Sequence, residues 1–212
     1  MIRVISINVG RPRNLELTGG RQQQTAIDKR PVAGRVAVRT LGIEGDAQAD
    51  KKHHGGREQA VYAYAREDLN WWGERLGREL GNGRFGENLT LSGIDVNGAL
   101  LGERWRIGTA LLEITAARVP CVVFRSWMNE PGWVKRFTEA ERTGAYFRVL
   151  EEGDVAVRDP VTVEYRPTAS VTVAESLRAF NGDRDLMRRI LTIPGHSADW
   201  DETAARVLRD SA

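Results

Sequence analysis

The stretch Ala110-Leu-Leu-Glu-Ile-Thr-Ala116 alternates as a β-strand does, and it runs through Arg118-Val-Pro-Cys121 to the only cysteine of the chain. Pro120 cannot donate a backbone hydrogen bond, so the strand is predicted to end there and to present the thiol at its mouth. A single cysteine excludes an intramolecular disulfide, which leaves a buried apolar side chain, a nucleophile or a soft metal ligand. Arg118 would stabilise a thiolate, the form that attacks and binds metal.

The segments around this stretch predict a mainly β fold. Residues 104–107 and 110–116 are expected to form a hairpin about Gly108-Thr109, and further strands are expected over residues 1–9, 25–30, 34–40, 146–150 and 161–165. Helical patterns cover residues 66–80 and 126–140. Because strands outnumber helices and the turns are short, we expect a closed β-barrel with peripheral helices rather than alternating βαβ units.

The pattern changes after residue 166. Thr172-Val-Ala-Glu175 is a capping box that predicts a helix through residue 180. Asp183 and Ser197 are predicted to cap two further helices over residues 184–191 and 198–208. We therefore divide the chain into a β-barrel domain, residues 1–166, and a small three-helix C-terminal domain, residues 167–212.

Charge and composition exclude several classes of protein. The 212 residues include 31 Lys and Arg against 29 Asp and Glu, a net charge of +2, so no overall charge favours stable nucleic-acid binding. No apolar run approaches the roughly 20 residues that span a bilayer, and the N-terminus lacks a signal-peptide core, so no membrane association is expected. One cysteine and no export signal predict a cytoplasmic protein.

Three polar segments are candidates for a binding site. The loop 41–58 is dense in Gly, Asp, Lys and His, and its glycines would let backbone N–H groups approach an anion. Its adjacent pair His53-His54 would point in opposite directions on an extended chain, so zinc is not expected. Lys29-Arg30 suits a phosphate, although it equally suits a protected sheet edge. In Phe85-Gly-Glu-Asn-Leu89, the amide of Asn88 suits the edge of a heterocycle.

These motifs occur in an order that is informative as a set. From the N-terminus they are Gly45-Asp46-x-Gln48-Ala49-Asp50, His54-Gly55-Gly56, Phe85-Gly-Glu-Asn88-Leu89, Gly102 ahead of a strand, and Arg118-x-Pro120-Cys121. The set resembles the MOSC domain, which is named after the C-terminal domain of molybdenum cofactor sulfurases. The resemblance is closest to stand-alone bacterial members with a three-helix C-terminal domain, which residues 172–208 resemble. It covers nearly the whole chain.

The resemblance implies a β-barrel that binds the molybdenum cofactor, molybdopterin. Cys121 matches the cysteine that serves either as molybdenum ligand or as sulfur carrier, and His54 would donate to cofactor or substrate. The residues implied in cofactor binding are Lys29, Arg30, Gly55, Gly56, Asn88 and Arg118.

The resemblance also implies an activity, because members with the helical appendage are linked to detoxification of N-hydroxylated purines such as hydroxylaminopurine. We therefore expect an oxidoreductase that converts a small R–NHOH substrate to R–NH2. A separate flavin or iron–sulfur reductase would supply electrons, since this chain lacks the cysteines for a cluster of its own. Two alternatives stay open, namely a sulfur carrier with a Cys121 persulfide and a non-catalytic carrier of the cofactor. A homodimer is also left open.

Overall fold

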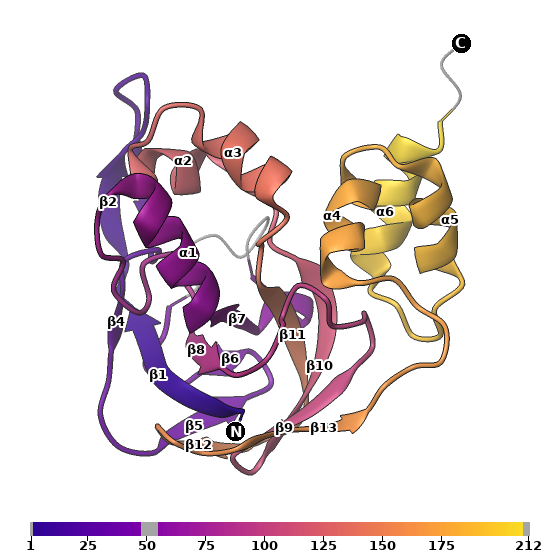
Figure 1. Cartoon of the computed structure of the whole chain (residues 1–212), viewed down its shortest axis with the longest axis horizontal. Coiled ribbons are helices and arrows are strands. Elements are labelled where there is room, and N and C mark those ends of the chain that lie inside the picture. The colour runs from indigo at the N-terminus through magenta and orange to yellow at the C-terminus, as the bar shows by residue number, and fades with distance from the viewer. Residues whose placement is uncertain (1, 48–54, 210–212) are drawn as a thin grey trace.

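The computed structural model describes residues 2–47 and 55–209, which form thirteen strands and six α-helices (Figure 1). Eight strands form the main sheet in the order β13-β9-β10-β11-β7-β8-β1-β4. Their bounds are β1 Arg3–Gly10, β4 Lys29–Pro31, β7 Val61–Ala65, β8 Leu89–Ser92, β9 Arg104–Ile107, β10 Ala110–Ala117, β11 Ala145–Glu151 and β13 Val161–Tyr165. Every pair is antiparallel except β7 and β8. The fold is thus mixed and rich in sheet.

The prediction of a closed β-barrel is not confirmed. Within the described residues, β13 and β1 share no continuous ladder and are joined by one isolated bridge between Arg3 and Pro160. Pro160 has no N–H to donate, and Arg158 just before it has a φ of 76°, so the local backbone departs from extended geometry. Three backbone hydrogen bonds join residues 2–4 to residues 158–161 here, but no continuous strand ladder closes the sheet.

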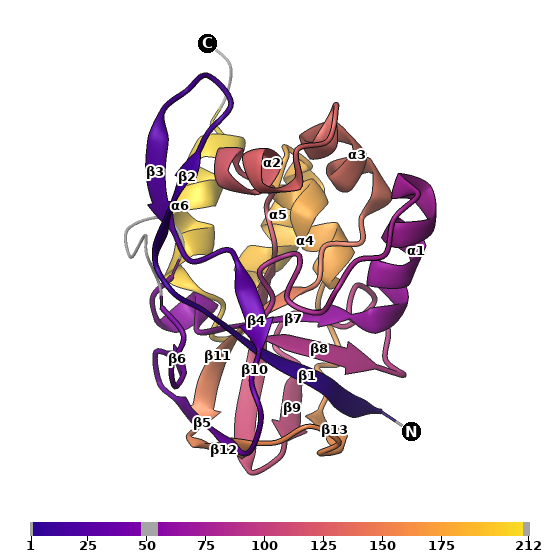
Figure 2. The same cartoon turned by 90° about the vertical axis from the view of Figure 1, so that its left-hand side faces the viewer.

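Two smaller sheets flank the main one. β5 (Val36–Arg39) lies between β12 (Gly153–Val155) and β6 (Gly42–Ile43), and β2 (Arg13–Glu16) pairs with β3 (Gln22–Thr25) in a hairpin that projects beside the helices (Figure 2). The predicted strand over residues 25–30 is wrong. The backbone N–H of Lys29 donates to the carbonyl of Ile27 at 2.9 Å, and this tight turn separates β3 from β4.

The hairpin around Gly108 is confirmed. Gly108 has a φ of 59°, and a Cβ atom there would lie 2.3 Å from the carbonyl oxygen of Asp154, so only glycine fits the turn. The second strand of the hairpin, β10, is buried on both faces apart from half-buried Ala116. It therefore lies between the hydrophobic core of the sheet and the helices that cover its other face.

Three helices cover one end of the sheet. α1 (Arg66–Leu76) is shorter than predicted because Gly77 adopts the left-handed conformation that ends it. The single helix predicted over residues 126–140 is wrong. Asn129 and Gly132 both have positive φ, and they divide it into α2 (Val122–Met128) and α3 (Trp133–Ala140). An aromatic cluster holds these helices on the sheet: Trp72, Phe85, Phe124, Trp133 and Phe137.

The three C-terminal helices form as predicted, and they lie beside β10 (Figure 1). They are α4 (Val173–Phe180), α5 (Arg184–Leu191) and α6 (Ala198–Val207). The capping box of α4 is complete, because the Thr172 hydroxyl accepts from the Glu175 N–H and the Glu175 carboxylate accepts from the Thr172 N–H. Leu177, Met187 and Trp200 belong to the same hydrophobic core as the sheet. The division at residue 166 therefore stays a prediction.

Within residues 2–47 and 55–209, no helix combines the length and the apolar character that crossing a bilayer requires.

Candidate functional site

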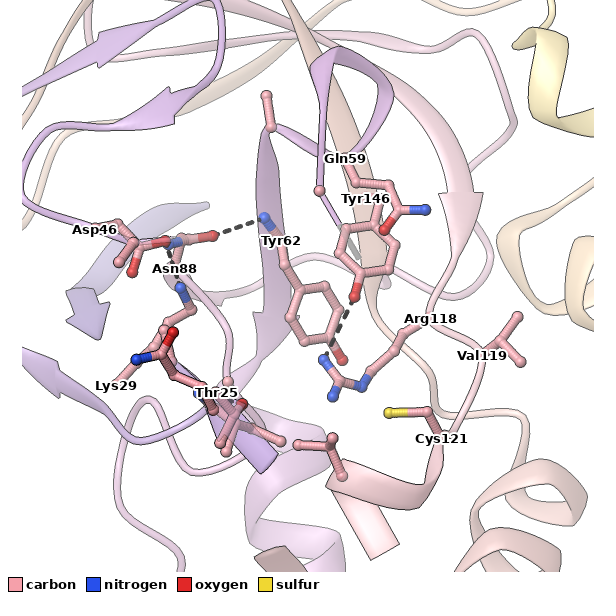
Figure 3. Close-up of a pocket in the computed structure, with 18 of the residues that line it drawn as sticks. Thr25, Lys29, Asp46, Gln59, Tyr62, Asn88, Arg118, Val119, Cys121 and Tyr146 are labelled. Carbon is pink, nitrogen blue, oxygen red and sulfur yellow. Dashed lines mark hydrogen bonds and ion pairs between the residues drawn. The ribbon is translucent and has the colours of Figure 1, made fainter. Parts of the chain in front are cut away.

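The end of β10 and the start of α2 form one wall of a polar cavity, which we call the Arg118 cavity (Figure 3). The opposite walls come from β3, β4, β7, β11 and the loop before β8. Its polar lining residues are Gln23, Gln24, Thr25, Lys29, Asp46, Gln59, Tyr62, Asn88, Arg118, Cys121 and Tyr146. Segments that are distant in the sequence therefore meet at the cysteine that the sequence singled out.

Arg118 is buried, and no carboxylate of the described residues forms an ion pair with it. The residue is 7% exposed, and its guanidinium lies over the rings of Phe124 at 4.3 Å and Tyr62 at 5.1 Å. Nη1 donates to the Tyr146 hydroxyl at 3.5 Å, whereas Nε is buried without a hydrogen-bond partner. Among the described residues, no carboxylate lies within ion-pair distance. Burial disfavours the charge, but interactions with Tyr146, Tyr62 and Cys121 outweigh burial and raise the pKa of Arg118.

Lys29, by contrast, is neutralised by a neighbour. Its ammonium group forms an ion pair with Asp46, and both side chains are almost fully buried. Burial lowers the pKa of Lys29 below its usual value, while the Asp46 carboxylate opposes that shift. Asp46 also accepts from the backbone N–H of Gly10 at 2.7 Å and from Nδ2 of Asn88 at 2.8 Å. The charge of Arg118 is thus the one left uncompensated in this set.

The side-chain amide of Asn88 is hydrogen-bonded within the protein at both its oxygen and its nitrogen. Its Oδ1 accepts from the backbone N–H of Tyr62 at 3.1 Å, and its Nδ2 donates to Asp46. The geometry therefore gives Asn88 the role of positioning Asp46, and through it Lys29. A direct contact with a heterocycle edge would require these bonds to break.

The neighbouring Glu87 shapes the loop that carries Asn88. Its carboxylate is buried, and it accepts from the backbone N–H groups of Gly83 at 2.5 Å and Phe85 at 3.0 Å. Burial raises the pKa of Glu87. The loop bends so that Gly86, with a φ of 76°, faces the cavity, where a Cβ atom would lie 3.8 Å from Nη1 of Arg118. The Phe-Gly-Glu-Asn motif therefore builds a cavity wall close to Arg118.

Cys121 lies where the strand pattern predicted. It has extended backbone dihedral angles directly before α2, and the carbonyl of Cys121 accepts the first α2 hydrogen bond, from Arg125 at 2.9 Å. The side chain is half-buried. Figure 3 shows its sulfur pointing into the cavity, toward the side that holds the Arg118 guanidinium. A thiol and an uncompensated cation therefore face the same space.

Of the predicted site residues, the cavity brings together Lys29, Gly55, Asn88, Arg118 and Cys121. It does not include Arg30, whose side chain is 75% exposed and pairs with Asp28 at 2.6 Å. Arg30 therefore matches the sheet-edge interpretation of Lys29-Arg30. Gly56 lies just before the short 3-10 helix η1 (Arg57–Gln59) and does not line the cavity. His54 lies outside the described residues.

Two cavity residues escaped the sequence interpretation. Tyr62 on β7 and Tyr146 on β11 lie directly opposite each other, with ring centroids 4.9 Å apart. Burial raises the pKa of both hydroxyls. The alternation Val61-Tyr-Ala-Tyr-Ala65 was visible in the sequence. Their pairing was not, because it depends on the register between two strands that are about 80 residues apart.

A second cavity lies on the other side of Cys121, between the sheet and the C-terminal helices. We call it the Trp200 cavity. It is lined by Glu58, Gln59, Thr115, Ala116, Ala117, Val119, Cys121, Tyr146, Ser176, Phe180, Ser197, Asp199, Trp200 and Thr203. Gln59, Val119, Cys121 and Tyr146 line both cavities and form their shared wall.

Comparison with known proteins now identifies the family. The model of the MOSC domain matches residues 50–162, which include the loop before β8 and Cys121. The chain belongs to the MOSC domain family. Among similar proteins, YflK of Bacillus subtilis (strain 168) is 39% identical over 200 residues, covering 93% of this chain and 90% of YflK.

Solved structures extend the likeness to the whole chain. The crystal structure of YiiM from Geobacillus stearothermophilus superposes with a TM-score of 0.81 at 32% identity, covering 99% of this chain and all of that one.

A protein of Gibberella moniliformis (strain M3125 / FGSC 7600) named as a reductase is 27% identical over 198 residues. That match covers 90% of this chain and 35% of the reductase.

Proposed function

We propose that this MOSC domain protein binds the molybdenum cofactor in the Arg118 cavity and reduces N-hydroxylated compounds to amines, with Cys121 as molybdenum ligand. The observation that carries the proposal is the buried Arg118 beside Cys121. A guanidinium with an unpartnered Nε and no carboxylate is costly to bury, and an anionic ligand would offset that cost. MOSC domains are associated with molybdenum cofactor sulfurases, which makes this cofactor the first candidate anion.

The residues present fit such a group. Arg118 and Lys29 would hold a phosphate, and Gly55 would offer backbone donors at the same rim. Gly86 packs closely against Ile27, where a Cβ atom would lie 3.1 Å from Cγ1, so a larger residue would crowd the wall beside Arg118. The thiolate of Cys121 is the soft ligand that a thiophilic metal prefers. When bound, the cofactor would supply the two electrons that cleave an N–O bond.

The overall reaction balances as R–NHOH + 2 e⁻ + 2 H⁺ → R–NH2 + H2O. Tyr146 lies at the shared wall of both cavities and keeps its proton, because burial raises its pKa. Its hydroxyl accepts from Arg118, which leaves the O–H to donate to a departing oxygen. The electron donor would be a separate flavin or iron–sulfur reductase. A relative named as a reductase that is much longer than this chain supports that link to redox chemistry.

The test compares wild type with Cys121→Ser after purification from a host that makes the cofactor. We expect molybdenum and pterin near one per chain in the wild type and their loss in the variant. Turnover of an N-hydroxylated base should fall by at least about a hundredfold, because loss of a direct metal ligand should cost more than the roughly 10- to 100-fold loss typical of residues that only orient a ligand. Arg30→Ala is the control, because Arg30 lies off the cavity and should change neither value. Full cofactor content and activity in Cys121→Ser would contradict the proposal.

One observation favours a sulfur carrier as the second candidate. Cys121 lines two cavities, so a persulfide formed from one side is reachable from the other. Incubation with a cysteine desulfurase and L-cysteine should then add one sulfur atom to the wild type and none to Cys121→Ser, as read by mass spectrometry. A wild type that takes up no sulfur while retaining cofactor excludes the carrier. Cofactor without any turnover would instead support a non-catalytic cofactor carrier.

A further inference from the structure

We propose that the C-terminal helices hold Arg118 and Cys121 in position through two buried hydrogen bonds to the end of β10, which makes Ser176 and Trp200 positioning residues of the candidate site. The inference deepens the proposed function, and it rests on that function only in taking Arg118 and Cys121 as the functional pair. In this role neither Ser176 nor Trp200 needs to contact a ligand.

The last residues of β10 depart from a regular strand. Among the described residues, β9 pairs with β10 only as far as Glu113, whereas β11 continues to the end of β10. The register between β10 and β11 shifts between Ile114 and Ala116, so Thr115 is an extra residue of the kind that a β-bulge contains. Bulges bend a strand and re-aim the side chains next to it. The direction in which the chain runs on to Arg118 therefore depends on how this bulge is held.

Side chains of α4 and α6 bond the backbone of this bulge. Nε1 of Trp200 on α6 donates to the carbonyl of Thr115 at 3.0 Å. The hydroxyl of Ser176 on α4 accepts from the N–H of Ala117 at 3.1 Å, and it donates to a carbonyl of its own helix at 2.8 Å. Because Ala117 comes directly before Arg118, the second bond fixes the backbone one residue from the buried arginine.

The side chain of Thr115 ties the bulge to two further walls of the Arg118 cavity. Its hydroxyl donates to the carbonyl of Glu58 at 2.6 Å and lies 3.2 Å from the carbonyl of Tyr146. Glu58 precedes Gln59 on η1, and both Gln59 and Tyr146 line the cavity. A displacement of the bulge would therefore move the end of β10, η1 and β11 relative to one another.

These two bonds act on geometry more than on the stability of the fold. Leu177, Met187 and the ring of Trp200 lie in the hydrophobic core, and their burial already holds the C-terminal helices against the sheet. Ser176 is fully buried. A buried hydrogen bond contributes little net stability but is costly to leave unmade, so it selects one arrangement of its two partners.

The test measures the geometry of the pair through alkylation of Cys121 in the full chain without cofactor. The thiolate displaces iodide from both iodoacetate and iodoacetamide, but only iodoacetate has a carboxylate that Arg118 attracts. Because both reagents meet the same thiolate and are similar in size, the ratio of their rate constants reports the position of Arg118 relative to the sulfur. Arg118→Met should lower the ratio of iodoacetate to iodoacetamide about tenfold, which sets the lower limit.

Ser176→Ala and Trp200→Phe should each lower this ratio about threefold to tenfold, because each removes one bond to the bulge and keeps its helix packed. The matched controls are Thr172→Ala and Ser197→Ala, which remove the N-caps of the same two helices without removing a bond to β10. Both controls should keep the wild-type ratio despite their lower stability. Circular dichroism and urea unfolding establish that each variant is folded under the assay conditions.

Wild-type ratios in both Ser176→Ala and Trp200→Phe would overturn the proposal. An equal fall in the two cap variants would also overturn it, because the helices would then act through stability alone. The result is separable from the proposed function, since alkylation needs no cofactor. A fall confined to Ser176→Ala and Trp200→Phe in a protein that binds no molybdenum would retain the positioning role and reject the proposed function. Cofactor binding with unchanged ratios would do the reverse.

Discussion

Two arginines on adjoining parts of the sheet show how the same side chain serves two purposes. Arg148 on β11 has every guanidinium nitrogen bonded: Nε to Glu113 at 3.0 Å, Nη1 to Glu58 at 3.3 Å and Nη2 to the Gly195 carbonyl at 2.7 Å. Arg118, just past β10, is more deeply buried, yet its Nε has no partner and no carboxylate lies beside it. The first arrangement stabilises the fold, whereas the second costs stability unless an anion binds.

The difference assigns separate functions to Arg118 and to the cluster of charges around Arg148. We define the Glu113 cluster as Glu58, Arg104, Glu113 and Arg148, in which each carboxylate meets at least one arginine. It joins β9, β10, β11 and η1 and reaches the C-terminal helices through Gly195. Removal of one partner of a buried ion pair is strongly destabilising, because it leaves the other charge buried and unpaired. Variants of the Glu113 cluster should therefore change stability, whereas variants of Arg118 should change ligand binding.

The largest stability effect is expected in the Glu113 cluster. Glu113→Gln removes the carboxylate that two arginines share and should lower the free energy of unfolding by about 2–3 kcal/mol. The measurement is a urea unfolding curve. The matched control is Glu164→Gln on β13, which removes an exposed partner of Arg106 and should leave the curve unchanged. Equal unfolding curves for Glu113→Gln and wild type would show that the Glu113 cluster does not stabilise the fold.

Replacement of the unpaired arginine should have a smaller effect on stability. Arg118→Met deletes a buried charge and keeps an apolar side chain between the Tyr62 and Phe124 rings. The free energy of unfolding in the absence of ligand should change by less than about 1 kcal/mol, or rise. The same urea experiment measures it. A loss as large as that of Glu113→Gln would show that Arg118 is a structural residue and would abolish the contrast.

The last prediction concerns the pH dependence of anion binding rather than the stability of a variant. Burial lowers the pKa of Lys29 in the folded protein below its usual 10.5, so this lysine loses its proton at a lower pH than an exposed lysine does. Sulfate, which does not titrate in this range, should bind the Arg118 cavity about tenfold more weakly once pH rises above that lowered value. Because the folded pKa lies below the unfolded one, stability without ligand rises with pH over the same interval.

The control for that titration is Lys29→Arg, which keeps its charge and should move the loss of sulfate affinity to higher pH. A decline at the same pH in both proteins would exclude Lys29 from anion binding.

The parts of the fold that could be predicted are those set by local chemistry. The hairpin at Gly108, the caps at Thr172, Asp183 and Ser197, and the placement of Cys121 after β10 follow from residues close in sequence. The break between α2 and α3 was missed, although Asn129, Pro131 and Gly132 mark it. The lack of a continuous ladder at Pro160 depends on how distant strands meet, which no local pattern encodes.

The residues of the candidate site divide in the same way, into those that local motifs predict and those that depend on distant contacts. Lys29, Asn88, Arg118 and Cys121 were found from motifs, and the cavity contains all four. Their partners were not found, because Tyr146 reaches Arg118 across strands and Asp46 reaches Asn88 across 42 positions of sequence. The Trp200 cavity could not be predicted, since it exists only where α6 packs on β10.

The most direct test of the central claim is the molybdenum and pterin content of Arg118→Met beside wild type and Glu113→Gln, each purified folded from a cofactor-producing host. We predict that Arg118→Met retains its stability but almost no cofactor, and that Glu113→Gln retains the wild-type amount per folded chain despite its lower stability. Folded Arg118→Met with wild-type cofactor content would contradict the assignment of Arg118 to the ligand.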